Sequence, residues 1–290
     1  MGDQGSLPLN SWDSHMHIVD PIKYPLSQDA QYTPSTHTLA EAIEFESSFG
    51  ISNIVLVQPS IYGFDNSCLL DGLRELGSQH GRAVVTIDPQ NIQQEILFEW
   101  HQLGVRGVRL NLQSTGRQIS PEELAACVRQ HADIIRPFNW VLQLYISLSS
   151  VKALLDVVPN LGVRVCLDHF SSPALPQGAE TTAFDPYSLS GFTDLVSLLN
   201  GGNTYVKISA PYRLSTDPHF QFLGIIAKEL MRIAPDRLVF ATDWPHTRFE
   251  GLDISPFVKM CLDWCGGDGI LTKKLFQQNA EELWDARKER

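Results

Sequence analysis

Short runs of apolar, often β-branched residues alternate with longer amphipathic segments along the chain. Such runs are typical of buried strands, and a helical segment between successive strands is typical of the βα units that build a parallel sheet. The pattern predicts eight strands, which span Ser11–Val19, Ile51–Gln58, Arg82–Asp88, Val105–Leu112, Trp140–Ile146, Val163–His169, Thr204–Ser209 and Arg237–Thr242.

The segments between these runs carry apolar residues at helical spacing, and most begin with a capping or turn residue. They predict helices over Thr38–Phe49, Cys68–Leu76, Asn91–Leu103, Ser120–Arg136, Ser149–Val157, Gly191–Leu199, Pro218–Ile233, Pro256–Cys265 and Leu271–Arg287. Eight strands alternating with at least eight helices predict an α/β fold of the (β/α)8 TIM barrel type. A doubly wound open sheet is the alternative that this pattern leaves open.

No linker, repeat or low-complexity stretch divides the chain. The prediction is therefore a flexible N-terminus over residues 1–10 and a single barrel domain over residues 11–290. The longest irregular stretch, Ser171–Ser190, is rich in Pro, Gly and Ser and follows a predicted strand. In a barrel it would lie on the catalytic face, so it is either a substrate-covering loop or a surface insertion.

Composition narrows the classes of partner. The net charge is −11 and there is no Lys/Arg-rich run, so the surface repels phosphate backbones and anionic lipids. We therefore expect a small-molecule substrate, and neither nucleic acid nor a membrane; a monomer and a homo-oligomer both stay open. The five cysteines lack C-x-x-C spacing, no apolar run reaches the roughly 18 residues of a membrane span, and no signal peptide is recognisable. These features predict a cytoplasmic protein.

Polar side chains stand at the carboxyl ends of three predicted strands. His15 and His17 are two residues apart on the first strand, so both imidazoles point to the same side. His169 ends the sixth strand, and Asp243 directly follows the apolar eighth strand, where an unpaired carboxylate would be costly to bury. Each alone is more often structural. Because barrel enzymes build their active sites at these strand ends, the four together form the candidate catalytic cluster.

Three motifs connect this cluster to a known family. W-D-S-H-M-H at residues 12–17, L-D-H-F at residues 167–170 and T-D-W-P-H at residues 242–246 resemble the amidohydrolase superfamily in its amidohydrolase-2 branch. Within that branch the chain is most similar to the 2-pyrone-4,6-dicarboxylate lactonase family, through Y-T-P at 32–34, Q-P-S at 58–60, G-V-R-G-V-R-L-N-L at 104–112 and K-I-S-A-P-Y-R-L at 207–214. The resemblance implies a hydrolase that opens a lactone.

The resemblance also implies roles. Asp243 would be the general base that deprotonates an attacking water, while His15, His17 and His169 would polarise the lactone carbonyl and stabilise the oxyanion. Opening a carboxylated, pyrone- or muconolactone-like ring would give a carboxylate and an enol that tautomerises to a ketone. His246 would either donate to the product or order the base. The implied substrate-binding residues are Tyr32, Ser60, Arg109, Arg117, Tyr145, Arg213 and His246.

The arginines need further sorting. Arg106 and Arg109 are three residues apart and face opposite sides of a regular strand, so at most one of them lines the site. Arg213 stands in a predicted loop and could instead be solvated. The family pattern has an arginine three residues after the mid-chain histidine, whereas this chain has Ser172. One carboxylate anchor is then missing, and a larger or less charged lactone would fit better than a dicarboxylated pyrone.

A cofactor is a separate question. His15, His17, His169 and Asp243 have the donor types of a mononuclear Zn or Mn site, as in metal-dependent decarboxylases of this superfamily. Trp140–Ile146 contains neither the lysine nor the glutamate that would bridge two metals. The pyrone lactonase family works without a divalent metal, so we favour no cofactor. The alternatives are a metal-dependent decarboxylase of an aromatic or unsaturated acid, and a binding protein without activity, which the retained polar cluster argues against.

Overall fold

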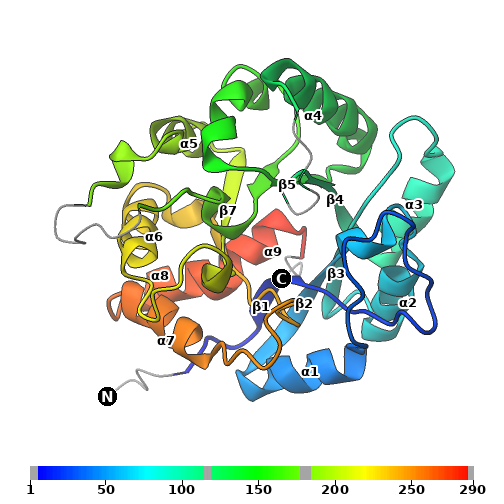
Figure 1. The fold of residues 1–290 in the computed structure, drawn as a ribbon, viewed down its shortest axis with the longest axis horizontal. Coiled ribbons are helices and arrows are strands. Elements are labelled where there is room, and N and C mark those ends of the chain that lie inside the picture. Colours follow the sequence, from blue (N-terminus) through cyan, green and yellow to red (C-terminus); the bar gives the residue numbers. More distant parts are fainter. Residues whose placement is uncertain (1–5, 114–115, 117–118, 177–183, 287–290) are drawn as a thin grey trace.

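Parallel strands lie side by side in chain order around a central axis (Figure 1). The computed structural model describes residues 6–113, 116, 119–176 and 184–286. Each strand coincides with a predicted run, so the predicted TIM barrel is confirmed. The eight strands are β1 (Ser11–Met16), β2 (Ile51–Val57), β3 (Gly81–Val85), β4 (Val105–Asn111), β5 (Val141–Tyr145), β6 (Val165–Leu167), β7 (Thr204–Ile208) and β8 (Leu238–Phe240).

Backbone hydrogen bonds connect β1 to the chain just beyond β8. The Asp243 amide donates to the His15 carbonyl at 2.9 Å, and the His17 amide donates to the Trp244 carbonyl at 2.8 Å. A doubly wound sheet reverses its strand order partway across and leaves two open edges, whereas these strands pair in simple chain order. The open-sheet alternative is therefore wrong.

Two carboxyl groups are buried behind this closure. Asp13 accepts hydrogen bonds from the His15 amide at 2.8 Å, the Thr242 amide at 3.1 Å and the Thr242 hydroxyl. Glu46 reaches the same hydroxyl at 3.5 Å. Burial raises the pKa of Asp13 to about 6 despite these donors, and burial next to Asp13 raises the pKa of Glu46 well above its ordinary value. The pair therefore holds a proton more tightly than exposed carboxyls do.

Helices form a ring outside the strands (Figure 1). Capping boxes begin two of them, with Thr38 before Glu41 and Ser120 before Glu123. Among the described residues no helix has the length and apolarity needed to cross a membrane. The α-helices are α1 (Leu39–Ser48), α2 (Ser67–Leu76), α3 (Gln94–Leu103), α4 (Pro121–Ile135), α5 (Phe192–Asn200), α6 (Gln221–Ile233), α7 (Ser255–Trp264), α8 (Gly269–Lys273) and α9 (Asn279–Leu283).

The segment predicted as a helix over Ser149–Val157 is helical in its first part, but it is not an α-helix. The segment between β5 and β6 forms 3-10 turns over Leu148–Leu154 instead. The Ser147 hydroxyl is hydrogen-bonded to the hydroxyls of Ser149 and Ser150, at 3.0 and 2.8 Å. Serine side chains that bond locally compete with the helical backbone, so the apolar spacing that follows does not produce an α-helix.

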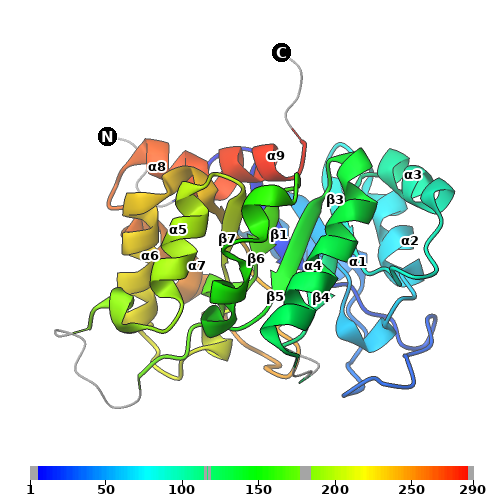
Figure 2. The same ribbon diagram turned by 90° about the horizontal axis from the view of Figure 1, so that it is seen from above.

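The C-terminal helical segment packs against one end of the barrel (Figure 2). It was expected as one helix over Leu271–Arg287; its described part runs from α8 through a π-helical turn, Lys274–Gln278, into α9. Trp284 follows α9, is fully buried among inward-facing strand residues such as Val84, and donates from its indole to the Ser14 hydroxyl at 3.1 Å. The loops that follow the strands gather at the opposite end (Figure 2), and the candidate site lies there.

Candidate active site

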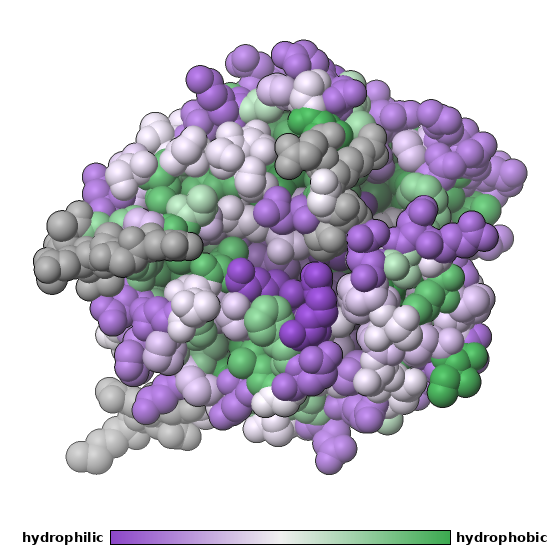
Figure 3. Space-filling view, in the orientation of Figure 1, coloured by the Kyte–Doolittle hydropathy of each residue, from purple (hydrophilic) through white to green (hydrophobic). Residues whose placement is uncertain are grey.

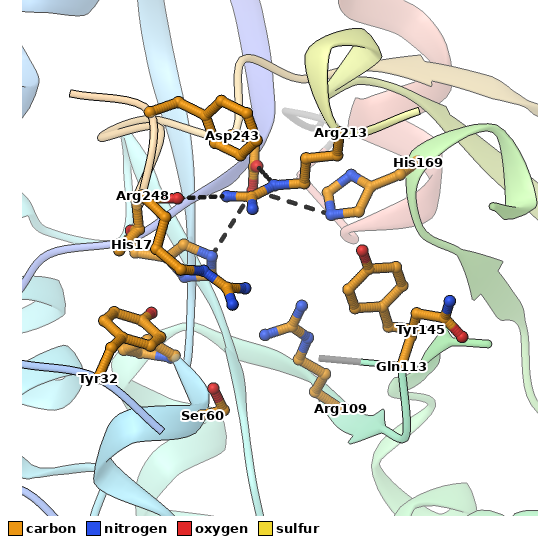
Figure 4. Close-up of a pocket in the computed structure, with 13 residues that line it drawn as sticks. His17, Tyr32, Ser60, Arg109, Gln113, Tyr145, His169, Arg213, Asp243 and Arg248 are labelled. Carbon is orange, nitrogen blue, oxygen red and sulfur yellow. Dashed lines mark hydrogen bonds and ion pairs between the residues drawn. The ribbon is translucent and has the colours of Figure 1, made fainter. Parts of the chain in front are cut away.

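Four buried side chains meet at the carboxyl ends of β1, β6 and β8, and Figure 4 shows three of them. Asp243 Oδ1 lies 3.6 Å from His15 Nε2, 3.7 Å from His17 Nε2 and 3.9 Å from His169 Nε2. The two Nε2 atoms of His15 and His17 are 3.3 Å apart. All four residues are at most 8% exposed. The fold thus brings His15 next to Asp243, although 228 positions separate them in the sequence.

Irregular backbone at the strand ends aims these side chains. The pairing register of β1 with β2 shifts near its carboxyl end, and His17 stands one residue beyond β1. His169 and Asp243 adopt left-handed backbone, with φ of 52° and 65°. This conformation is uncommon for residues other than glycine and is found where the surrounding structure holds it, frequently at functional sites. Here the bond from the Asp243 amide to the His15 carbonyl helps to hold it.

The second oxygen of Asp243 is bound by the short helical turn that follows β7. Asp243 Oδ2 accepts from Arg213 Nε at 2.6 Å and from the Tyr212 hydroxyl at 2.7 Å. Burial alone would raise the pKa of Asp243, but the Arg213 guanidinium outweighs burial and holds that pKa well below its ordinary value. Asp243 is therefore ionised at neutral pH, and Arg213 is not simply solvated.

The histidines are neutral at the same pH. Burial lowers the pKa of His17 and of His169 to about 4, and it also lowers the pKa of His15 well below its ordinary value. The fixed hydrogen bonds of their Nδ1 atoms orient two of the rings. His17 Nδ1 lies 2.7 Å from the Val57 carbonyl oxygen, and His169 Nδ1 lies 2.8 Å from Ser209 Oγ. One ionised carboxylate thus faces three neutral imidazoles.

A cavity of about 420 Å³ opens from this cluster. Figure 3 shows strongly hydrophilic side chains around a hollow near the centre of this face. Five of the sequence-predicted binding residues line it, namely Tyr32, Ser60, Arg109, Tyr145 and Arg213. The other lining residues are His17, Pro59, Gln113, His169, Asp243, Thr247, Arg248 and Phe249.

One predicted binding residue is described by the structure but does not line the cavity. His246 is buried beneath it, with its ring packed against Phe45 and Tyr212 and its amide donating to the Asp243 carbonyl at 3.0 Å. His246 was expected either to donate to the product or to order Asp243, and its position is compatible with the second role. Arg117 lies outside the described residues.

The two arginines of β4 have different surroundings, and only one of them lines the cavity, as the alternation of side chains along a strand predicts. Arg109 is 6% exposed, lines the cavity and donates to the Gln58 carbonyl at 3.1 Å and to Asp168 at 3.4 Å. Arg106 instead donates to the His101 carbonyl and pairs with Asp285, beside the C-terminal segment. Only Arg109 can therefore contact a ligand in the cavity.

The loop after β8 supplies cavity residues that sequence reasoning missed. Arg248 is exposed at the cavity, with its guanidinium 5.1 Å from the centre of the Tyr32 ring. No carboxylate pairs with it among the residues that the structure describes. Phe249 packs against Tyr212, on the other side of the same loop. The available signal was a basic residue five positions after Asp243, in the loop that follows a barrel strand.

A second missed group lies beneath the histidines. Lys207 on β7 and Gln143 on β5 are both fully buried, and both contact the Asp168 carboxylate. Lys207 Nζ lies 2.7 Å from Gln143 Oε1 and 3.2 Å from His15 Nδ1. A lysine on a strand ordinarily faces solvent. The alternation of side chains along the strand therefore does not predict that Lys207 is buried beneath the histidines.

The spacing of the cluster admits a divalent cation. His15, His17 and Asp243 offer ligand atoms 3.3–3.7 Å apart, and His15, Asp168 and His169 form a second, overlapping group. Ligand atoms that bind Zn²⁺ tetrahedrally at about 2.0–2.2 Å are roughly 3.3–3.6 Å apart. Distances and donor types therefore fit a metal, provided that each imidazole turns a lone pair toward it.

Curated relatives share most of the chain. The 4-sulfomuconolactone hydrolase of Hydrogenophaga intermedia is 28% identical over 249 residues, covering 84% of this chain and 77% of the relative. The 2-pyrone-4,6-dicarboxylate hydrolase of Comamonas testosteroni is 26% identical over 257 residues, covering 85% and 80%.

A solved structure and a family model also match nearly the whole chain. The structure, from Pseudomonas putida, is assigned as a 2-pyrone-4,6-dicarboxylic acid hydrolase; it is 28% identical, superposes with a TM-score of 0.81 and covers 98% of this chain and all of its own. The model of the family described as amidohydrolase (Amidohydro_2) matches residues 12–286, which include all four residues of the buried cluster. This chain belongs to the amidohydrolase family.

Proposed function

We propose that this chain is a hydrolase that opens a lactone ring bearing at least one carboxylate or sulfonate group. The observation that carries the proposal is the ionised oxygen of Asp243, with three imidazole nitrogens 3.6–3.9 Å away, in a cavity lined by arginines. The names of two relatives, hydrolases of a sulfomuconolactone and of a pyrone dicarboxylate, support a cyclic ester with an anionic substituent.

The proposed chemistry uses Asp243 as general base. It accepts a proton from a water whose oxygen attacks the ring carbonyl carbon, and the carbonyl oxygen becomes an oxyanion. Imidazole N–H groups of the cluster stabilise that oxygen. The ring carbon–oxygen bond then breaks, and the proton held by Asp243 goes to the leaving oxygen. The products are a carboxylic acid, which ionises, and an enol, which becomes a ketone.

Through its contact with Asp243, Arg213 makes the basicity of Asp243 depend on the charge of the substrate. A carboxylate with such a low pKa is a weak base, because Arg213 neutralises it at 2.6 Å. An anionic substituent of the substrate that binds Arg213 weakens this contact and so raises the pKa of Asp243 toward a useful value. On this proposal, a lactone without an anion leaves Asp243 paired and reacts slowly.

Two further arginines define where anions bind. Arg109 and Arg248 extend toward the same cavity from β4 and from the loop after β8 (Figure 4). Ser172, where the family pattern has an arginine, is 8% exposed and cannot supply a charge. We assign the missing anchor to Arg248, on the Tyr32 side of the cavity. A lactone with two anionic groups is then acceptable, held differently from a pyrone dicarboxylate in its own enzyme.

We further propose that turnover needs no resident metal, because Asp243 and the neutral imidazoles already provide a base and N–H donors. If a divalent cation is bound, His15, His17 and Asp243 would hold it, with His169 next to them. It would supply Lewis-acid polarisation and activation of water. This donor set also keeps the alternative of a metal-dependent decarboxylase open.

The test is ring opening by purified protein, followed by ultraviolet absorbance. The substrates are 2-pyrone-4,6-dicarboxylate, 4-sulfomuconolactone, muconolactone and an uncharged lactone, with Asp243→Asn as the control for the base. Metal content is measured on the same sample, and activity is repeated after chelation. Opening of at least one anionic lactone, loss of activity in Asp243→Asn and resistance to the chelator are the expected results.

Other outcomes point elsewhere. No opening of any lactone together with CO2 release from an aromatic acid would establish the decarboxylase alternative. Lactone opening that disappears with removal of about one bound metal would keep the reaction class but contradict the metal-free chemistry.

A further inference from the structure

Lys207 is a fully buried lysine whose ammonium group lies directly beneath the histidine cluster. Its Nζ is 2.7 Å from Gln143 Oε1, 3.2 Å from His15 Nδ1 and 3.4 Å from Asp168 Oδ1. An ammonium group has three donors and no acceptor. Each of these neighbours must therefore present an acceptor to it.

The amide of Gln143 is oriented by the same network. Its Nε2 donates to Asp168 Oδ2 at 3.0 Å, so its Oε1 faces Lys207. The flipped amide would place an NH2 group against the ammonium and an oxygen against the carboxylate, losing both hydrogen bonds. Lys207 thus has two acceptors, Gln143 Oε1 on β5 and Asp168 Oδ1 just beyond β6, before His15 is considered.

His15 Nδ1 is the third partner, and it can accept only when it carries no proton. Asp168 Oδ1 lies 3.3 Å from the same nitrogen and would favour the opposite tautomer, with a proton on Nδ1. The Lys207 ammonium group, however, lies 3.2 Å from this nitrogen and 3.4 Å from Asp168 Oδ1, so it can donate to both and leave the nitrogen as an acceptor. The proton of a neutral His15 is then on Nε2.

The neighbouring histidine matches this arrangement. His17 Nδ1 lies 2.7 Å from the Val57 carbonyl oxygen, which only accepts, so His17 carries its proton on Nδ1 and a lone pair on Nε2. That lone pair is 3.3 Å from His15 Nε2. A continuous direction of donation results, from Lys207 to His15, from His15 to His17, and from His17 to Val57.

We propose that Lys207 is a positioning residue that fixes His15 in the tautomer with its proton on Nε2. This tautomer turns an N–H donor toward the centre of the cluster, beside Asp243 Oδ1, where a lactone oxygen becomes negative if the proposed function holds. It also withholds the Nε2 lone pair that a metal would need from His15. The distances of the cluster admit a cation, but this proton disfavours one.

The first experiment reads the tautomer in the wild-type protein. Histidine labelled with ¹⁵N is incorporated, and the ring signals of His15 are assigned by their loss in His15→Asn. The expected spectrum has a protonated Nε2 and an unprotonated Nδ1. A protonated Nδ1 in the wild-type protein would overturn the proposal, whether or not any lactone is hydrolysed.

The second experiment removes the donor with Lys207→Met, which keeps much of the side-chain length. His15 Nδ1 is then free to donate to Asp168, so the tautomer should reverse and Nε2 should gain its lone pair. Zn²⁺ affinity, measured by competition with a fluorescent chelator, should rise at least about tenfold, and kcat for lactone opening should fall about 10–100-fold with a smaller change in KM. Lys228→Met, on an exposed position of α6, is the matched control and should change none of these.

The outcomes separate the two proposals. The expected tautomers without lactone hydrolysis would sustain the role of Lys207 and remove the proposed function. A folded Lys207→Met protein with an unchanged His15 tautomer and unchanged Zn²⁺ affinity would contradict the role of Lys207. If that variant does not fold, the wild-type spectrum alone decides.

Discussion

Asp243 and the histidines around it have opposite protonation states at neutral pH, and both states follow from their surroundings. Burial disfavours charge on every member of the cluster, and it lowers the pKa of the histidines accordingly. Asp243 escapes this effect because Arg213 and Tyr212 donate to its second oxygen. The same side chains therefore determine how the reaction responds to pH and to the charge of the substrate.

The first residue-scale prediction concerns pH. His17 and His169, each with a pKa lowered to about 4, bind protons only as pH falls through that value. Once protonated, these histidines carry a positive charge next to Asp243 Oδ1 and form ion pairs with it. That oxygen can then no longer accept a proton from water. We expect kcat/KM for lactone opening to stay level from pH 8 to about pH 5 and to decline below. An acid limb centred near the ordinary histidine pKa of 6.5 would be the contrary result.

The second residue-scale prediction concerns Arg248. Replacing it with Ala removes one charge-assisted contact with a lactone that carries two anionic groups, and should raise KM for that lactone roughly tenfold with little change in kcat. A lactone with a single anion should be affected less. Steady-state kinetics on matched lactones provide the measurement.

The control for Arg248 is Arg74→Ala, an exposed arginine on α2 that pairs with Asp71. It should leave both kinetic constants unchanged. Equal losses for dianionic and monoanionic lactones in Arg248→Ala would show that Arg248 does not discriminate by charge.

The residues that strand topology could predict share a rule, and those that it missed do not. His15, His17, His169 and Asp243 stand at strand ends, where barrel topology itself brings side chains together. Lys207 also lies on a strand, but nothing in an alternating pattern distinguishes a buried lysine from an exposed one. Arg248 and Tyr212 lie in loops and turns, whose paths depend on packing and not on periodicity.

At the scale of elements, the strands were predictable because most of them are short, largely apolar runs. The types of helix in Leu148–Leu154 and in the C-terminal segment were harder to predict. The apolar spacing of 271–287 predicts one helix, and the described chain includes a π-helical turn before α9 that this spacing does not predict. That turn brings Trp284 into the barrel end, where its indole donates to the Ser14 hydroxyl. A contact between residues 270 positions apart leaves no local signal.

The prediction at this scale concerns that contact. Trp284→Ala leaves a cavity among the buried strand residues around Trp284, such as Val84, and should lower the free energy of unfolding by about 3–5 kcal/mol. Thermal denaturation should show a fall in Tm on the order of 10 °C. Trp284→Phe should recover most of this loss, since it restores most of the buried volume. A variant with unchanged Tm would mean that α9 contributes little to closing this end.

At the scale of the whole molecule, a carboxyl pair is buried where the barrel closes, so the stability of the barrel should respond to pH. A group whose pKa is higher in the folded protein contributes stability below its unfolded pKa and loses it as pH rises through the folded pKa. For Asp13 this stability is lost as pH rises from about 4 to about 6. For Glu46 the loss also begins near pH 4 but continues to a higher pH. The pair should therefore destabilise the barrel between pH 5 and pH 8.

Glu46→Gln tests this directly, because the amide resembles the protonated carboxyl but does not titrate. We expect its Tm to decline less than that of the wild type between pH 5 and pH 8, and to exceed it at pH 8. Glu44→Gln, exposed on the same helix, should follow the wild-type curve. Parallel curves for Glu46→Gln and the wild type would exclude Glu46 as the source of the pH dependence.

The placement of Asp243 and Arg248 in one loop has a consequence for engineering and descent. The proposed base and the proposed charge selector are five residues apart, so a short exchange of this loop between relatives would carry both together. Random variation at Arg248 would alter which lactones are accepted while the buried cluster and the tryptophan at the far end stay intact. A library confined to residues 247–249 is therefore the economical route to new substrate preferences on this scaffold.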